Sequence, residues 1–320
     1  MTEQNNFPYA SRIEEVKNTI RLAIHGKDEI IDMVLCAAFA GGHILLEDIP
    51  GVGKTTLVTA LAKVLDLSYK RVQFTPDVLP SDISGFTMYD KNTGEFSFRE
   101  GAVYTNLFLA DEINRTSPKT QSALLEVMEE GRATVDGVTR DLPKPFLVIA
   151  TQNPIGASGT QKLPESQLDR FMVRLSMGYP NHESALDILK GDSHEIIREM
   201  PAIIHQEEIL QIQKTVSEIH VSESLYDYAV SLTEATRNED VFTLGLSPRG
   251  SIALLKMAKS HAFLSGRDFV IPEDFREVFL AIANHRVLLS TKAKATGSTV
   301  NTALLNAFGS CPIPRVHETH

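Results

Sequence analysis

A short segment rich in glycine carries residue types that can bind phosphate. It reads Asp48-Ile49-Pro50-Gly51-Val52-Gly53-Lys54-Thr55-Thr56, and it lies between an apolar run and a stretch with helical spacing. The glycines let the backbone approach a phosphate closely, and the N-terminus of the following helix favours negative charge. The lysine can reach the β- and γ-phosphates of ATP, and the first threonine hydroxyl can ligate Mg²⁺. The residues expected to bind the nucleotide are Gly51, Val52, Gly53, Lys54, Thr55 and Thr56, with Thr55 as a metal ligand.

Asp48 departs from the usual form of such a loop, because glycine normally occupies this position. The position lies at the edge of the loop, away from Lys54, and aspartate tolerates unusual backbone angles better than most residues. The alternative interpretation is a turn rich in glycine and proline that contains a lysine by chance. The preceding strand pattern, the following helix pattern and the Gly53-Lys54-Thr55 sequence together favour the phosphate site.

Two carboxylates follow a second apolar run. Leu107 to Ala110 predicts a buried strand, and Asp111 and Glu112 come directly after it. Carboxylates at this end of a strand lie at the sheet edge where ligands bind in α/β folds. We expect Asp111 to hold Mg²⁺ through water and Glu112 to act as general base on the attacking water. A strand that simply ends in polar residues is the alternative, and the glycine loop earlier in the chain argues against it.

An amide follows a third apolar run. Phe146 to Ala150 predicts another buried strand, and Asn153 lies just beyond it. There an amide can orient water or contact the γ-phosphate, which makes Asn153 a candidate for both catalysis and nucleotide binding. Asn-Pro is also a frequent turn, so the residue by itself leaves both interpretations open.

Two arginines are further candidates. Arg170 can stabilise the charge that develops during phosphoryl transfer, although a salt bridge with Asp169 or Glu165 explains it better from the local sequence alone. Arg249 follows Ser247-Pro248, a cap and a first helical residue. A cation in the first turn opposes the helix dipole, so helix stability does not explain Arg249 and a functional role is favoured.

The elements that must position these residues alternate between strand and helix. Strands are expected at 43–47, 72–74, 107–110, 146–150 and 172–175. Helices are expected over 11–41 with a break at His25-Gly26, from the glycine loop to about 65, and from Pro118, with Ser117 as N-cap, to Gly131. Such alternation predicts an α/β fold with a parallel sheet covered on both faces. Two β-hairpins are expected as inserts, at 86–99 and 132–141, and ordinary packing at the sheet edge is the alternative to a functional role for both.

The character of the chain changes after Tyr179-Pro180. Only helical patterns remain, at about 182–191, 206–217, 222–236, 249–265 and 273–283. We therefore expect an α/β nucleotide-binding core over residues 1–180 and a smaller α-helical domain over residues 181–320.

Composition restricts the classes of function. The chain has 320 residues and a formal net charge of −10, which disfavours general nucleic-acid binding. Its two cysteines, Cys36 and Cys311, have no metal-binding spacing, and Cys36 lies in an apolar run typical of a core. The N-terminus lacks a signal-peptide pattern and no apolar stretch is long enough to span a membrane, so a cytoplasmic location is expected.

Three ordered stretches resemble the MoxR family of AAA+ ATPases, and the similarity extends over nearly the whole chain. They read Asp111-Glu112-Ile113-Asn114-Arg115-Thr116-Ser117-Pro118-Lys119-Thr120-Gln121-Ser122-Ala123-Leu124-Leu125-Glu126, Ala150-Thr151-Gln152-Asn153-Pro154 and Leu163-Pro164-Glu165-Ser166-Gln167-Leu168-Asp169-Arg170-Phe171. The resemblance implies a P-loop AAA+ core with hairpin inserts and a smaller all-α lid domain. It implies the following roles: Lys54 and Thr55 in Walker A, Asp111 and Glu112 in Walker B, Asn153 as sensor 1, Arg170 as an arginine finger for a neighbouring subunit, Arg249 as sensor 2, and His25-Gly26 beside adenine.

The resemblance also implies partners. Family members form ring oligomers, usually hexamers, act as chaperone-like factors, sometimes in metal-cofactor insertion, and often work with proteins that carry von Willebrand factor A domains. In such rings both hairpins can face a central pore. Two alternatives remain: a nucleotide-gated scaffold with little turnover, which Glu112, Asn153 and Arg170 argue against, and a nucleic-acid motor, which the net charge argues against.

Overall fold

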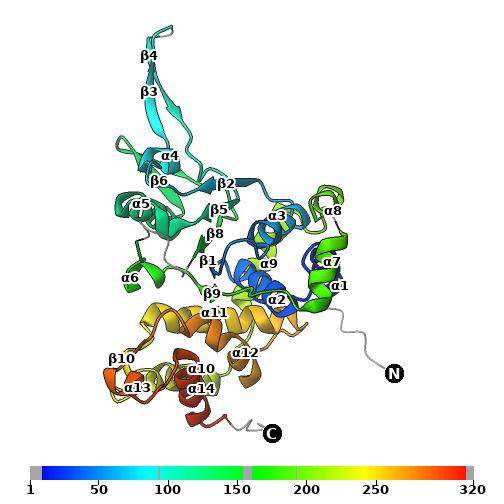
Figure 1. Ribbon diagram of the computed structural model, residues 1–320, viewed down its shortest axis with the longest axis vertical. Coiled ribbons are helices and arrows are strands. Elements are labelled where there is room, and N and C mark those ends of the chain that lie inside the picture. The colour runs from blue at the N-terminus through cyan, green and yellow to red at the C-terminus, as the bar shows by residue number, and fades with distance from the viewer. Residues whose placement is uncertain (1–8, 93, 154–160, 192, 315–320) are drawn as a thin grey trace.

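A five-stranded parallel sheet forms the centre of the molecule (Figure 1). The computed structural model describes residues 9–92, 94–153, 161–191 and 193–314. The strand order is β2-β5-β8-β1-β9, and all four neighbouring pairs are parallel. The strands are β1 (Ile44–Glu47), β2 (Tyr69–Gln73), β5 (Leu107–Asp111), β8 (Leu147–Gln152) and β9 (Val173–Leu175). Because the strands are parallel, their carboxyl ends share one edge of the sheet. The predicted site residues lie at or just after these strand ends.

Successive side chains of the central strands enter two different hydrophobic cores. In β5, Leu107 and Leu109 pack into the core on one face, whereas Phe108 and Ala110 pack into the core on the other. Helices α1 (Ala10–Arg21), α2 (Asp28–Phe39) and α3 (Lys54–Val64) supply the first core, and α5 (Pro118–Glu130) supplies the second. This arrangement confirms the predicted parallel sheet with helices on both faces.

The edge strand β2 is longer than the sequence indicates. It begins at Tyr69, whereas the apolar pattern predicts a start at Val72. The added residues include Lys70 and Arg71, which are exposed because β2 pairs only with β5 and has an open side. An edge strand therefore tolerates charged residues that obscure its pattern. The short helices α4 (Pro80–Ser84), α6 (Glu165–Leu168) and the 3₁₀ helix η1 (Ile113–Arg115) also lie outside the predicted elements.

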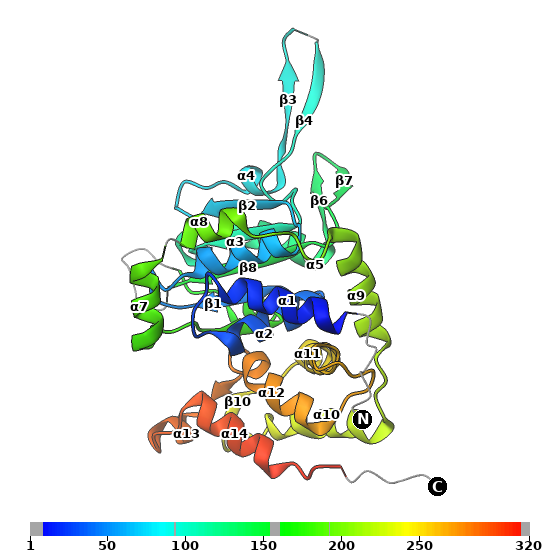
Figure 2. The same ribbon diagram turned by 90° about the vertical axis from the view of Figure 1, so that its right-hand side faces the viewer.

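Both predicted hairpins are present, formed by β3 (Phe86–Asp90) with β4 (Glu95–Arg99) and by β6 (Arg132–Val135) with β7 (Val138–Asp141). Figures 1 and 2 show the β3–β4 hairpin projecting far beyond the sheet, with β6–β7 beside its base. The guanidinium of Arg140 lies 3.8 Å from the centre of the Phe98 ring, which joins the two hairpins. Turn residue Thr93 lies outside the described residues.

The chain after residue 180 is mainly helical. Its helices are α7 (His182–Lys190), α8 (Ser193–Glu199), α9 (Gln206–Glu218), α10 (Glu223–Ala235), α11 (Pro248–Leu264), α12 (Pro272–Ala283), α13 (Thr291–Ala295) and α14 (Val300–Ser310). The expectation of a purely helical region misses a two-stranded antiparallel sheet of β10 (Phe242–Leu244) and β11 (Leu288–Leu289). These strands are too short for an alternating pattern to be recognised.

Several helices of this region pack on the sheet-containing part. Helix α8 contacts α3, and α9 and α11 both contact α2. Cys36 is fully buried as predicted, and its carbonyl accepts a hydrogen bond from Ser260 Oγ at 2.7 Å. One continuous core thus extends across residue 180, and a domain division at that residue stays a prediction. Among the helices that the structure describes, none is long and apolar enough to cross a membrane.

Candidate active site

The glycine loop has the predicted context of strand, loop and helix. It leaves β1 at Glu47 and enters α3 at Lys54. Gly51 and Gly53 adopt φ angles of +84° and +92°, a left-handed backbone that favours glycine. These angles end the strand abruptly and allow the first turn of α3 to begin directly at the lysine.

A cavity of about 390 Å³ lies at the carboxyl edge of the sheet. Its lining residues are Pro50, Gly51, Gly53, Lys54, Thr55, Thr56, Arg71, Gln73, Asp111, Glu112 and Asn153. The structure thus brings together eight of the predicted site residues from three separate segments. Val52 is different, because its side chain packs against the hydrophobic core rather than lining the cavity.

The ammonium of Lys54 is held by the loop itself. Nζ donates to the carbonyl oxygens of Asp48 at 2.7 Å and Ile49 at 3.2 Å. Burial lowers the pKa of Lys54, while the negative charges of Asp48, Asp111 and Glu112 partly oppose that shift. The ammonium lies where a phosphate could replace its carbonyl partners.

Asp111 is fixed on both carboxylate oxygens. Oδ1 accepts a hydrogen bond from Thr151 Oγ1 at 2.6 Å, and Oδ2 lies 2.6 Å from Nη2 of Arg71. Thr151 Oγ1 in turn accepts a hydrogen bond from the backbone N–H of Glu112 at 2.8 Å. One threonine hydroxyl therefore ties both carboxylate-bearing residues to the end of β8.

Glu112 has an unusual backbone conformation. Its φ and ψ angles are +56° and +49°, the left-handed region that few residues other than glycine adopt. Its Oε2 accepts hydrogen bonds from Gln73 Nε2 at 2.9 Å and from Arg115 Nη1 at 2.7 Å. The strained turn and these two donors hold the carboxylate at the cavity wall beside Lys54.

Four residues of this site were missed by the sequence analysis, namely Arg71, Gln73, Arg115 and Thr151. Gln73 lies within the predicted strand and is the register partner of Asp111 on the neighbouring strand, whereas Arg71 lies before the predicted start of that strand. Thr151 follows the predicted strand end by one residue. Arg115 lies within the quoted stretch after Asp111, but no spacing rule indicated that it would reach back to Glu112.

The structure explains why aspartate replaces glycine at position 48. The side chain is 7% exposed, and Oδ2 accepts hydrogen bonds from the backbone N–H groups of Met177 and Gly178 and from Ser176 Oγ. These three donors belong to the segment between β9 and α7. Asp48 therefore anchors the start of the glycine loop to the chain that leads into the C-terminal helices, which glycine could not do.

The donor atoms at the cavity fit magnesium. The hydroxyl of Thr55 and the carboxylates of Asp111 and Glu112 are all hard oxygen ligands. Within the described residues there is no group of three or more histidine, cysteine, aspartate or glutamate side chains that could hold a metal. The hydroxyl and carboxylate oxygens at the cavity suit Mg²⁺, which takes one or two protein carboxylates and completes its shell with water and phosphate oxygens.

Arg170 and Arg249 line a second cavity, of about 290 Å³, between α5, α11 and the chain before β9. Arg170 Nη1 donates to the carbonyl of Leu125 at 2.6 Å and lies 3.2 Å from Oε2 of Glu129. Arg249 Nη2 pairs with the other oxygen, Oε1, of Glu129. The ion-pair partner of Arg170 is thus Glu129, rather than Asp169 or Glu165 as the local sequence suggested. Neither arginine lines the cavity that contains Lys54.

The His25-Gly26 segment also lies outside the lining of the Lys54 cavity. Gly26 has a φ angle of +66°, and a Cβ atom there would lie 2.3 Å from Ser184 Oγ in α7. The neighbouring Lys27 Nζ donates to the carbonyl of Tyr179 at 3.0 Å. This segment therefore contacts the beginning of the C-terminal helices, and its contact with adenine stays a prediction.

Two regions of the chain match known families. Residues 43–173 match the family described as ATPase family associated with various cellular activities (AAA), and residues 234–306 match the AAA lid domain. The uncharacterized protein YeaC of Bacillus subtilis is 46% identical, with 90% of this chain and 91% of YeaC covered. Chaperone MoxR1 of Mycobacterium tuberculosis is 36% identical, with 93% of this chain and 81% of that protein covered.

A solved structure is also similar over its full length. The crystal structure of a candidate ATPase from Cytophaga hutchinsonii superposes with a TM-score of 0.88, at 37% sequence identity, and 98% of each chain is covered. The same overall fold therefore occurs in a related protein.

Proposed function

The chain belongs to the MoxR family of AAA+ ATPases, and from that membership we propose that it hydrolyses ATP with Mg²⁺ to remodel or activate client proteins. One observation carries the catalytic part of this proposal. Lys54, Thr55, Asp111, Glu112 and Asn153 line one cavity although they come from three distant segments. A phosphate-binding cation, a metal-binding hydroxyl and a carboxylate base are the parts that phosphoryl transfer to water requires.

Each side chain has a distinct role in the proposed reaction. Lys54 binds the β- and γ-phosphates, and the glycine loop supplies backbone N–H donors. Thr55 and Asp111 would hold Mg²⁺, which neutralises phosphate charge when bound. Glu112 accepts the proton of the attacking water, and Asn153 orients that water or the γ-phosphate. Gln73 and Arg115 both donate hydrogen bonds to Oε2 of Glu112. When the attacking water binds, these donors must release Oε2 or share it with the water.

Oligomerisation is proposed to complete the site. AAA+ proteins generally form oligomeric rings, and Arg170 and Arg249 line a cavity separate from that of Lys54. In a homo-oligomeric ring, with six subunits in our proposal, the arginines of one subunit face the γ-phosphate bound by the next. An arginine is always charged and presents several donors, so it can stabilise the transition state from across an interface.

The client-facing part is proposed to be the β3–β4 hairpin. A relative named as a chaperone supports work on other proteins, and the hairpin carries exposed apolar side chains. They are Phe86, Met88, Tyr89 and Phe96, which are 40–75% exposed. A partner with a von Willebrand factor A domain belongs to the same proposal, as an adaptor to the client.

The Glu112→Gln variant tests this function. The amide keeps the shape of the side chain but cannot accept the proton, so steady-state phosphate release should fall about 10²- to 10⁴-fold while ATP binding persists. The ATP-bound variant should also retain client proteins that the ADP-bound form releases. Phosphate release at the wild-type rate would show that Glu112 is not the base. A wild-type protein that binds ATP but releases no phosphate would instead indicate a nucleotide-gated scaffold.

A further inference from the structure

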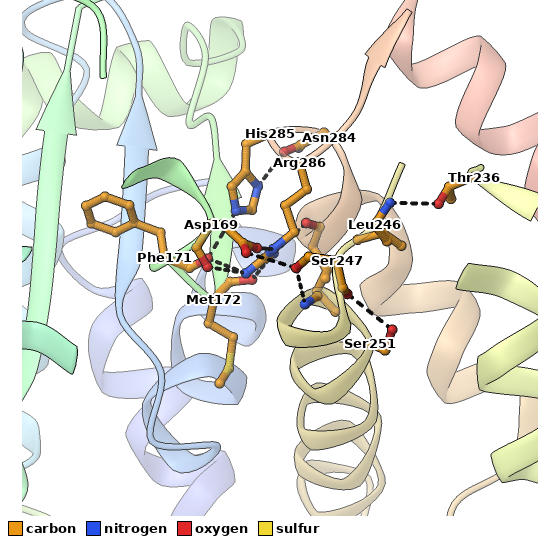
Figure 3. Close-up of polar contacts among 12 residues, drawn as sticks. Asp169, Phe171, Met172, Thr236, Leu246, Ser247, Ser251, Asn284, His285 and Arg286 are labelled. Atoms are coloured by element: carbon orange, nitrogen blue, oxygen red, sulfur yellow. Dashed lines mark hydrogen bonds and ion pairs between the residues drawn. The ribbon is translucent and has the colours of Figure 1, made fainter. Parts of the chain in front are cut away.

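A buried arginine joins the sheet to the C-terminal helices. Arg286 follows α12 and is 5% exposed, and Figure 3 shows its guanidinium directed toward the chain that precedes β9. Nε donates to Asp169 Oδ1 at 2.7 Å. The remaining donors reach four main-chain carbonyls, those of Asp169, Phe171, Met172 and Ile282, at 2.6–3.2 Å. Every guanidinium nitrogen therefore has a partner, which a buried charge requires.

The second carboxylate oxygen of Asp169 extends this link to another helix. Asp169 Oδ2 accepts a hydrogen bond from Ser247 Oγ at 2.8 Å (Figure 3). The same hydroxyl caps α11 by accepting from the backbone N–H of Gly250 at 3.1 Å. One carboxylate thus connects the chain before β9, the end of α12 and the first turn of α11.

Both proposed catalytic arginines are attached directly to this network. Arg170 is the residue after Asp169, and Arg249 lies two residues beyond Ser247. At their far ends, the two guanidinium groups share the carboxylate of Glu129. Their side chains are therefore held relative to each other at the backbone by Asp169 and at the tips by Glu129.

Stability alone does not account for such an arrangement. Burying an ion pair costs desolvation free energy, and apolar residues of similar volume often replace such pairs without loss of stability. The hydrogen bonds from Arg286 and from Ser247 to the Asp169 carboxylate are directional and connect segments that are more than 70 residues apart in sequence. An apolar contact would not fix the orientation of the two segments.

We propose that Asp169 and Arg286 are positioning residues that hold Arg170 and Arg249 as one rigid pair for a neighbouring subunit's nucleotide. The proposal rests on the proposed function, because it assumes that both arginines act across a subunit contact. Arg286 is 5% exposed, and both carboxylate oxygens of Asp169 are paired within the chain, so their role is to orient the two arginines. Misplacing a catalytic group by about 1 Å can reduce the rate on the order of 10²-fold.

The mildest test removes one hydroxyl and has a matched control. Ser247→Ala deletes the hydrogen bond to Asp169 together with the cap of α11. Ser290→Ala deletes an equivalent hydroxyl, which caps α13 by accepting from Ala293 at 3.1 Å and donates to the Asp240 carbonyl at 2.8 Å. We expect the two variants to unfold at similar temperatures and to bind ATP with similar affinity. Only Ser247→Ala should lower kcat, at least about fivefold, with little change in KM for ATP.

A stronger variant is Asp169→Asn, which keeps the size of the side chain but removes its charge. Its subunits retain Lys54 and Glu112 and lack only correctly placed arginines. When mixed with Glu112→Gln subunits, which keep their arginines in place, they should regain hydrolysis, as Arg170→Ala subunits should. When mixed with Arg170→Ala subunits they should not.

The outcomes are distinct for each proposal. A kcat equal to wild type in folded Ser247→Ala and Asp169→Asn proteins would overturn the positioning role, as would failure of Asp169→Asn to be rescued when Arg170→Ala is rescued. If Asp169→Asn does not fold, the comparison of Ser247→Ala with Ser290→Ala decides alone. If Arg170→Ala itself hydrolyses ATP at the wild-type rate, the proposed function fails instead.

Discussion

Single side chains in the Lys54 cavity divide the work between binding and hydrolysis. The Lys54 ammonium donates to two carbonyls of its own loop rather than to a carboxylate. Its positive charge is therefore available to a bound phosphate. Glu112 is held by a different pair of residues, Gln73 and Arg115. Because different residues hold the cation and the base, variants should separate the two steps.

Replacement of Lys54 by alanine should weaken ATP binding at least about tenfold, because a charge-assisted contact contributes roughly 1.5–3 kcal/mol. Isothermal calorimetry measures the change directly. Lys63→Ala is the matched control, since this lysine lies on the exposed side of the last turn of α3. Equal affinities of the two variants would refute the phosphate-binding role of Lys54.

The pH dependence of stability should report His43. Its Nδ1 accepts from the N–H of Val148 at 3.0 Å and its Nε2 contacts the Met128 carbonyl at 2.9 Å, which requires a neutral ring. Burial lowers the pKa of His43 from 6.5 to about 4. Below pH 6.5 His43 is protonated in the unfolded chain but stays neutral in the folded chain. The free energy of unfolding should therefore fall as the pH decreases from 6.5 toward 4.

The size of this effect can be measured by denaturant unfolding at pH 7.5 and pH 5. His43 should account for at most about 2 kcal/mol of the loss, and less if the ring is hydrated from the adjoining cavity. His43→Gln should therefore lose less stability between these pH values than wild type. His182→Gln, at an exposed position, should behave like wild type. Identical pH dependence in all three proteins would contradict the assignment.

At the level of elements, the β3–β4 hairpin is anchored at its base and exposed farther out. Phe98 of β4 lies beneath Arg140 of β7 and beside Tyr104, so the base of the long hairpin is anchored. Tyr89 and Phe96 contact each other farther out, with tilted rings whose centroids are 5.2 Å apart, and are 51% and 75% exposed. The outer part of the hairpin is thus free to contact another protein.

Replacing Tyr89 and Phe96 with serine should leave basal ATP hydrolysis within about threefold, a change of roughly 0.65 kcal/mol in the barrier. The pair lies outside the Lys54 cavity, so its loss should instead abolish client retention when introduced into the Glu112→Gln protein. Phosphate release and client co-purification are the two measurements. A collapse of basal hydrolysis would place the hairpin in the nucleotide site or in a subunit interface.

At the level of the whole molecule, the proposed catalytic parts are divided between two cavities. Lys54 and Glu112 line one, and Arg170 and Arg249 line the other. Within one chain, neither arginine lines the cavity that contains Lys54 and Glu112. Activity should therefore depend on assembly, and hydrolysis per subunit should decrease when the protein is diluted enough to dissociate.

Mixing two inactive proteins tests this directly. Arg170→Ala and Glu112→Gln should each bind ATP and hydrolyse it poorly. In a mixed ring, an Arg170→Ala subunit keeps its own Glu112 and receives an arginine from a Glu112→Gln neighbour, so part of the activity should return. The control is a protein carrying both substitutions, which should not complement the Arg170→Ala variant. No recovery under conditions in which subunits exchange would show that Arg170 acts as a structural ion-pair residue.

The sequence alone determined the features that depend on short stretches of chain. The glycine loop, the strands that end at Asp111 and before Asn153, the Ser117 cap and both hairpins follow from local spacing and are present. Local periodicity predicts such elements because each residue's environment there depends on its near neighbours. Family membership followed from three short stretches for the same reason.

Tertiary structure alone decided the features that depend on distant contacts. In the sequence, Asp48 is a departure from the usual glycine loop. In the fold, its carboxylate accepts hydrogen bonds from the backbone N–H groups of Met177 and Gly178. Arg170 received Glu129 as its partner, and Asp169, the expected partner, pairs with Arg286, 117 positions away. No sequence pattern encodes which buried donors meet which acceptors, because those partners are chosen by packing across the whole sheet and its helices. For the same reason, the separation of the two arginines from the Lys54 cavity became apparent only in three dimensions.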